Sequence, residues 1–211
     1  MKVSSITIEP MQAKYNRQVG QLLVHGFKEK FFKLSKLNDS ILALFFEKLL
    51  EHFPNEPATH RVVALQAGNI VGTLSIKWWP ESELEGSTPQ PMLPLWREFR
   101  IFGKGALLKL LLGLYFLSYK PQPGECYIAD VTVHPNYRGE GIGKLMLGWA
   151  ELYARAHPSF NVLSLHVSSH NLGAKRLYEQ LSYHMHRKER SLLKYMLFHE
   201  LEWEYMKIKL K

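Results

Sequence analysis

The sequence predicts an α+β protein, because strand and helix patterns alternate along the whole chain. Three observations support this class. Near the start, a β-branched run precedes two stretches with helical spacing of apolar residues and then a hairpin pattern. In the middle, a strand enters a helix through a glycine-rich turn. Towards the end come another strand, another helix and a final strand-like run.

The first 78 residues predict one strand, two helices and a hairpin. Alternating β-branched residues indicate the strand, and apolar residues at helical spacing indicate the helices. Asn38, Asp39 and Ser40 are good N-cap types for the second helix, and Gly68-Asn69 supply the hairpin turn. The segments are residues 4–9 (strand), 13–34 and 39–53 (helices) and 59–78 (hairpin).

The next stretch is irregular and then strongly apolar. Residues 80–94 contain four prolines and three glutamates, and residues 103–119 are mostly apolar. The apolar core, residues 106–117, is shorter than the roughly 20 residues that span a bilayer. Because it is apolar all round, we expect it to be buried against the domain, against a second subunit, or along a hydrophobic substrate channel.

The second half predicts two strand and helix pairs followed by a tail. Its helices end before Pro158 and near residue 181. Arg187 to Lys194 form a basic run that we interpret as a solvated loop. The predicted segments are strand 126–133, helix 143–156, strand 162–167, helix 171–181 and a strand-like run at 203–210.

Composition fits one globular domain. The 211 residues are 46% hydrophobic and 22% charged, which suits one domain or at most two small ones, and we expect a single domain over residues 1–211. The only cysteine, Cys126, has no partner for an internal disulfide. No apolar core of signal-peptide length follows Met1, so we expect a cytoplasmic protein without a transmembrane segment.

The segment over residues 127–144 carries the clearest chemical signal, because its turn contains Gly139, Gly141 and Gly143. Glycines without a Cβ let a ligand approach the backbone, and the first N–H groups of the following helix are unpaired. Together with the helix dipole, these groups suit a phosphate or pyrophosphate.

Two common phosphate motifs do not fit this turn. A dinucleotide-type G-x-G-x-x-G starting at Gly139 requires glycine where Lys144 stands, and a P-loop requires glycine where Arg138 stands. The pattern that fits is R-x-x-G-x-G over residues 138–143, preceded by V-x-V-x-P over residues 131–135. This pair resembles the pyrophosphate-binding signature of the GCN5-related N-acetyltransferase (GNAT) superfamily.

A second match follows at residues 171–179, which resemble the N-x-x-A-x-x-L-Y-E segment of the same superfamily. The order of predicted elements is also similar to that of the superfamily, apart from residues 79–120. The resemblance implies a three-layer α/β acyltransferase fold with a mixed, mostly antiparallel central sheet of about seven strands flanked by helices. It also implies that the sheet splays between strands four and five, and that residues 79–120 are an insertion between strands three and four.

The resemblance implies acetyl-CoA as co-substrate, bound where strands 126–133 and 162–167 separate. Exposed strand amides would bind the pantetheine arm and thioester carbonyl, and the turn amides would hold the pyrophosphate. No metal is expected, because the histidines lack metal-ligand spacing. The implied cofactor-binding residues are Val131, Thr132, Val133, Arg138, Gly139, Glu140, Gly141, Ile142, Gly143, Lys144, Asn171 and Tyr178.

The implied reaction is direct attack of a primary amine on the thioester in a ternary complex. Tyr178 matches the usual general acid of the superfamily, and a phenol with an ordinary pKa of about 10 can protonate a thiolate. The acceptor, a small molecule or a peptide or protein, is not identified by the sequence, because the elements that hold it share no transferable code.

The general base has several candidates. His166 lies where the ribosomal-protein N-terminal acetyltransferases, which residues 165–179 resemble, carry a glutamate base, and a histidine there titrates near neutrality. Glu125 and Asp130 on the preceding strand compete, together with a water chain that needs no dedicated base. Strand alternation points these two carboxylates to opposite faces unless a bulge intervenes.

Two other functions compete with acetyl transfer. The first is a non-catalytic acyl-CoA-binding or partner-binding module of the same fold. The second follows from the net charge of +8, which is concentrated in the second half, and is association with nucleic acid or an anionic membrane surface. Two ordered motifs outweigh net charge, so no nucleic-acid partner is expected. A homodimer through residues 106–117 would explain their composition.

Overall fold

A seven-stranded sheet runs through the computed structural model, which describes residues 5–54, 58–80 and 99–211. The strand order is β1-β2-β3-β4-β5-β7-β6, and every neighbouring pair is antiparallel except the parallel pair β4 and β5. The predicted mixed, mostly antiparallel sheet is therefore confirmed. The strands are β1 (Ile6–Pro10), β2 (Thr59–Gln66), β3 (Asn69–Trp78), β4 (Glu125–Val133), β5 (Val162–Ser168), β6 (His184–Arg190) and β7 (Glu202–Lys209).

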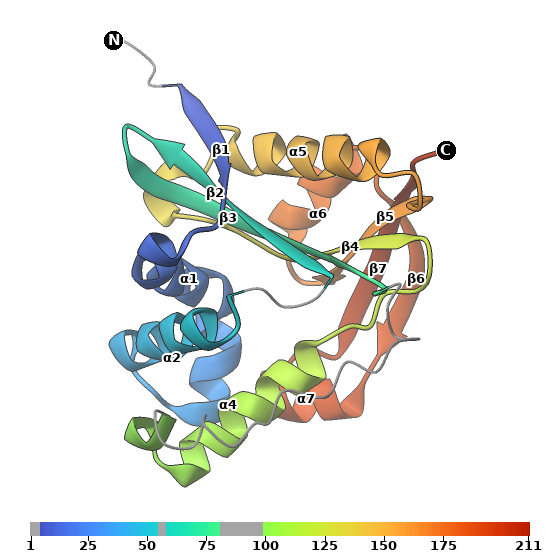
Figure 1. Cartoon of the computed structure of the whole chain (residues 1–211). Helices are drawn as coiled ribbons and strands as arrows, with labels where there is room; N and C mark the ends of the chain where they lie inside the picture. Colours follow the sequence, from blue (N-terminus) through green and yellow to red (C-terminus); the bar gives the residue numbers. More distant parts are fainter. Residues whose placement is uncertain (1–4, 55–57, 81–98) are drawn as a thin grey trace.

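Helices cover both faces of the sheet (Figure 1). One face carries α5 (Ile142–Ala156) and α6 (Leu172–Gln180), and the opposite face carries the remaining α-helices. Short 3-10 turns precede or connect several of them. The remaining helices are α1 (Asn16–Ser35), α2 (Asp39–His52), α4 (Lys104–Leu117) and α7 (Leu192–Phe198), with 3-10 turns at Ala13–Tyr15, Phe99–Phe102 and Pro135–Tyr137.

One apolar core lies on each face of the sheet. Strand residues such as Leu74 and Leu163 pack with Met146 of α5 on one side. On the other side, Phe31 of α1 and Phe45 of α2 form the centre of a cluster that also includes residues of α4 and β2. These packed layers hold the strands in fixed register, which sets the geometry of the site described below.

Local signals explain where several helices begin. The Asn38 side chain accepts a hydrogen bond from the amide of Ile41 at 2.9 Å, as expected for an N-cap. Asn171 caps α6 in the same way and accepts from the Ala174 amide at 3.2 Å. The predicted helix positions are thereby confirmed to within a few residues.

The segment between β3 and β4 contributes α4, which packs on α1 at Gly113. A Cβ at this glycine would lie 2.7 Å from Cδ2 of Leu34 and 2.9 Å from Cε1 of Phe31, so the two helices approach closely. The opposite side of α4 is exposed at Leu108, Leu112 and Tyr115, which differs from the burial expected all round. Residues 81–94 of the predicted irregular stretch lie outside the described residues.

Two predictions were wrong in detail. The hairpin turn falls at Ala67-Gly68, which both have positive φ, and Asn69 already begins β3. The basic run from Arg187 to Lys194 is not a loop, because it forms the end of β6 and the start of α7. Pairing with β7 keeps this polar segment in a strand, an interaction that local sequence patterns do not reveal.

No helix among the described residues combines the length and the apolarity needed to cross a membrane.

Candidate active site

The glycine-rich turn between β4 and α5 presents free backbone amides. Gly139 and Gly141 have φ of +85° and +82°, and a Cβ at either would meet no atom within 4 Å, so the turn is open on its outer side. The first hydrogen bond of α5 runs from the Leu145 amide to the Gly141 carbonyl. Within the described part of the chain, the amides of residues 139–144 donate to no acceptor, which leaves them available to an anion.

Strands β4 and β5 separate just beyond their last pair, Ile128 with Leu165. Further along, β4 remains paired only with β3, and β5 only with β7. Each strand therefore turns an unpaired edge towards the other, and the glycine-rich turn lies at the end of one of these edges. The predicted splay between the fourth and fifth strands is confirmed.

A β-bulge in β4 places both candidate carboxylates on one face. Ser75 pairs with Asp130 and Ile76 pairs with Ile128, so Ala129 is the extra residue. The bulge reverses the alternation after it, and the side chains of Glu125 and Asp130 both face α1. Thr132 faces the same way, since a Cβ at Gly26 of α1 would lie 2.4 Å from its hydroxyl oxygen.

Asp130 is held in a bidentate ion pair with Arg61. Its two carboxylate oxygens each lie 2.7 Å from a guanidinium nitrogen, and Arg61 also donates to Thr73. Both charged side chains are largely buried, with 18% exposure for Arg61 and 11% for Asp130. This geometry joins β2 to β4 and engages both carboxylate oxygens of Asp130 with Arg61.

Glu125 is a buried carboxylate that accepts hydrogen bonds from three hydroxyl groups and one amide. The Tyr205 hydroxyl lies 2.6 Å from Oε1, the Tyr119 hydroxyl lies 3.1 Å from Oε2 and the Gln122 amide lies 2.7 Å from Oε2. Ser164 also donates to Oε1. Burial, followed by the interaction with Glu125, raises the pKa of Tyr205 to about 12, so this phenol stays protonated as a donor.

His166 stands at the first position of β5 beyond the separation and lies within an aromatic box. Its Nδ1 lies 3.1 Å from the Tyr127 hydroxyl, and its ring centroid lies 4.8 Å from that of Tyr119 and 5.0 Å from that of Tyr205. On the other side, Nε2 lies 3.5 Å from the Glu189 carboxylate. Burial lowers the pKa of His166 below its ordinary value of 6.5, although Glu189 acts in the opposite direction. We call Tyr119, Glu125, Tyr127, His166 and Tyr205 the His166 cluster.

Sequence reasoning did not single out three members of this cluster. Tyr127 lies two residues from Glu125, so strand alternation could have found it. Tyr119 follows the insertion helix and Tyr205 belongs to the last strand, and no local pattern links either of them to His166. Glu189, which bonds both His166 and Arg187, was also missed.

Tyr178 lies on α6, on the opposite face of the sheet from His166. The side chain is 7% exposed, and burial raises its pKa to about 12. Tyr178 belongs to the core cluster beneath α5, whereas Tyr127 bonds His166 on the other face of the sheet.

Cys126 is an unsuitable nucleophile. It is fully buried, and burial together with the neighbouring Glu125 raises the pKa of its thiol to about 12. Its environment is that of a small core residue.

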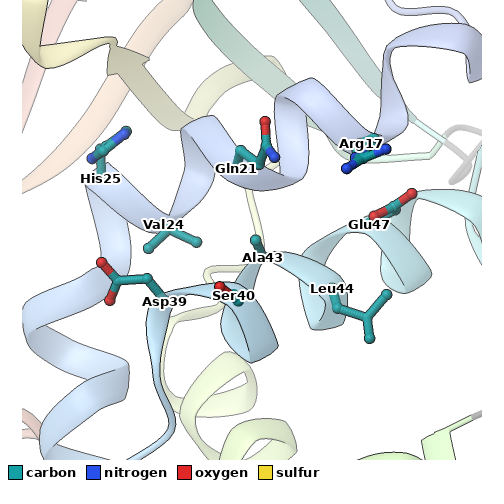
Figure 2. A pocket seen from close by; sticks show the side chains of 9 residues that line it. All are labelled: Arg17, Gln21, Val24, His25, Asp39, Ser40, Ala43, Leu44 and Glu47. Atoms are coloured by element: carbon teal, nitrogen blue, oxygen red, sulfur yellow. The ribbon is translucent and has the colours of Figure 1, made fainter.

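Two open grooves lie away from this cluster. One has a volume of about 540 Å³ and runs between α1 and α2, lined by residues such as His25, Asp39 and Glu47 (Figure 2). The other, of about 810 Å³, lies between α5 and the start of β6 and includes Lys144 and Lys207. Of the predicted site residues, Lys144 lines the second of these two grooves.

Comparisons with known proteins identify similar sequences and folds. The model of the acetyltransferase (GNAT) family matches residues 27–183. The uncharacterized N-acetyltransferase YycN of Bacillus subtilis (strain 168) is 34% identical over 77 residues, which are 36% of this chain and 49% of that protein. The match thus spans about half the length of this relative.

Solved structures show the same fold. Arabidopsis thaliana NAA60 in complex with acetyl-CoA has a TM-score of 0.59 at 17% identity, covering 97% of this chain and 98% of that chain. A variant of the spermidine N-acetyltransferase SpeG from Vibrio cholerae has a TM-score of 0.62 at 13% identity, covering 97% and 94%.

Proposed function

This chain belongs to the acetyltransferase (GNAT) family, and we propose that it transfers the acetyl group of acetyl-CoA to a primary amine. One observation carries the proposal. The edge between β4 and β5 opens beside the His166–Tyr127 pair and is continuous with the free amides that follow Arg138. The NAA60 structure with acetyl-CoA, which shares this fold, supports the same co-substrate here.

The proposed cofactor site uses backbone groups. The amides of residues 139–144 bind the pyrophosphate, with Arg138 and Lys144 exposed at the edges of the turn to add positive charge. The unpaired edge over residues 131–133 binds the pantetheine arm and presents an N–H group to the thioester oxygen. Asn171 caps α6 at the far side of the opening.

The proposed chemistry divides acid and base between the two sides of the sheet. The acceptor nitrogen attacks the thioester carbonyl carbon and forms a C–N bond, after which the C–S bond breaks. His166, neutral at pH 7 because burial lowers its pKa, takes the proton that the nitrogen loses. Tyr178, protonated because burial raises its pKa, gives a proton to the departing thiolate.

The other members of the His166 cluster orient the base. Tyr127 bonds Nδ1 of His166, and Tyr119 and Tyr205 enclose the ring while they bond Glu125. Glu125 thus acts through the tyrosines that surround His166. Asp130 has a structural role in this proposal, because Arg61 occupies both of its oxygens.

Cofactor binding is tested by calorimetry with acetyl-CoA on the Gly141→Val variant. A branched side chain at a φ of +82° strains the turn and crowds the amides, so we expect binding to be lost. The matched control is Gly148→Ala in α5, where a Cβ meets nothing within 4 Å and binding should be unchanged. Unchanged affinity of Gly141→Val for acetyl-CoA would contradict the assignment of pyrophosphate binding to this turn.

Catalysis is tested by following CoA release with a panel of amines, amino acids, polyamines and peptides. We expect at least one acceptor to be acetylated and Tyr178→Phe to lower turnover while acetyl-CoA still binds. Bound acetyl-CoA without turnover on any acceptor would favour a non-catalytic binding module.

A further inference from the structure

Trp203 of β7 lies next to the His166 cluster on the same face of the sheet. Tyr205 pairs with His166 and Trp203 pairs with Ser168, so the two aromatic residues are two positions apart along one strand. This spacing corresponds to about 7 Å. Trp203 is 5% exposed.

Two ammonium groups gather over the Trp203 ring. Nζ of Lys30, from α1, lies 4.6 Å from the ring centroid, and Nζ of Lys194, from α7, lies 5.2 Å from it. Among the residues that the structure describes, neither ammonium forms a hydrogen bond or an ion pair with a carboxylate. Cation–π contact compensates only part of the cost of placing two like charges here.

The indole nitrogen of Trp203 is also unpaired. Nε1 is buried and has no hydrogen-bond acceptor within the described ranges. A buried indole N–H ordinarily finds a partner. The Trp203 side chain therefore has two ammonium groups over its ring and an indole N–H without an acceptor.

Two of the acidic groups nearby, Glu200 and Glu189, have other partners. Glu200 accepts from the Ser168 hydroxyl at 2.5 Å and lies 3.2 Å from His170, and Glu189 is bonded by Arg187 and His166. Burial lowers the pKa of Lys30 to about 8, and the nearby charge of Lys194 lowers it further, while burial also lowers the pKa of Lys194. The opposing effects on the pKa are smaller: Glu200 and Glu29 raise that of Lys30, and Glu189 raises that of Lys194.

We propose that Lys30, Lys194 and Trp203 form a subsite for a carboxylate group carried by the acceptor amine. The inference rests on the proposed function, because the amine would then lie at His166, about 7 Å away along the strands. A carboxylate supplies the missing counter-charge and the missing acceptor for the indole N–H. The proposed acceptors are amino acids or peptides with a carboxylate, in contrast to polyamines, whose second ammonium would meet Lys30 and Lys194.

The first experiment detects binding without catalysis. The indole N–H signal of Trp203 is identified in a ¹⁵N correlation spectrum by its absence from Trp203→Phe, and sodium glutarate is then titrated with glutaramide as the uncharged control. We expect a saturable shift with glutarate alone. No shift, or an equal shift with glutaramide, would overturn the subsite.

The second experiment measures acetylation of ω-amino carboxylates and of the corresponding amides. We expect kcat/KM to favour the carboxylates by about tenfold or more, through KM, because hydrogen bonds to charged groups are strong. Lys30→Met and Lys194→Met, which keep the side-chain stem, should reduce this preference towards one. Lys33→Met, at an exposed position of the same helix as Lys30, is the matched control and should retain it.

The outcomes separate the two proposals. If no acceptor of any class is acetylated, the proposed function fails, whereas the Trp203 titration still decides the subsite. If carboxylates and amides are acetylated equally well, or polyamines are preferred, the subsite fails and acetyl transfer stands.

Discussion

The Tyr119 hydroxyl lies 3.1 Å from Oε2 of Glu125, so the segment between β3 and β4 ends inside the His166 cluster. The same tyrosine ring lies 4.5 Å, centroid to centroid, from Tyr127. A segment that the sequence resemblance left aside therefore completes the wall of the candidate active site. Its helix, α4, is fixed to α1 at Gly113, which sets the position from which Tyr119 reaches back.

Removing only the Tyr119 hydroxyl should reduce catalysis moderately. Tyr119→Phe keeps the ring contacts and loses one hydrogen bond to Glu125, so we expect kcat/KM to fall about fivefold. Tyr119→Ala should cost considerably more, because the ring over His166 is lost as well. Steady-state kinetics with Tyr115→Phe, a 71% exposed tyrosine of α4, provides the control. Parent activity in Tyr119→Ala would show that the insertion does not support the site.

The pH profile should report His166. Because burial lowers its pKa, the neutral base persists below pH 6.5, and the acidic limb of kcat/KM should lie below that value. His166→Gln should abolish the limb and lower kcat/KM by about 100-fold or more. His170→Gln, which alters an exposed histidine four residues away, should leave the limb in place. An identical acidic limb in His166→Gln would exclude His166 as the base.

Breaking the Arg61–Asp130 pair should affect stability more than chemistry. Asp130→Asn leaves a largely buried guanidinium without its charge partner, so we expect the free energy of unfolding to fall by about 2 kcal/mol. Urea unfolding measures this loss, and the double variant Arg61→Met/Asp130→Leu should recover much of it. A large fall in kcat at unchanged stability would instead indicate that Asp130 takes part in proton transfer.

The contact between α4 and α1 should be sensitive to volume at Gly113. Gly113→Ala forces a methyl group against Phe31 and Leu34, so we expect a loss of about 1–2 kcal/mol in stability together with reduced activity through Tyr119. Gly105→Ala, where a Cβ meets nothing within 4 Å, should lower neither. Thermal unfolding and kinetics of both variants make the comparison. Equal stability and equal activity of the two variants would show that the packing of α4 on α1 does not require glycine at position 113.

The local pattern of the chain is sufficient to predict most elements and the glycine-rich turn between β4 and α5. Residues 131–143 contain the strand, the turn glycines and the helix start, and their conformation depends on neighbours close in sequence. The same holds for Asn171, whose capping role requires only the next three residues. These features appear in the structure at or within a few residues of their predicted positions.

Local pattern could not predict the composition of the His166 cluster. Strand alternation alone separates Glu125 from Asp130, whereas the bulge at Ala129 places both on one face. Likewise, the basic run at residues 187–194 joins the sheet only because β7 pairs with it.

The sequence by itself therefore determined the class of fold, the turn between β4 and α5, and the positions of His166 and Tyr178 on their strand and helix. Only the tertiary structure decided which side chains surround His166, and that Lys30 and Lys194 meet over Trp203. The physical reason is that these contacts join segments far apart along the chain. Their proximity depends on strand register and helix packing across the whole sheet, which no short window of residues specifies.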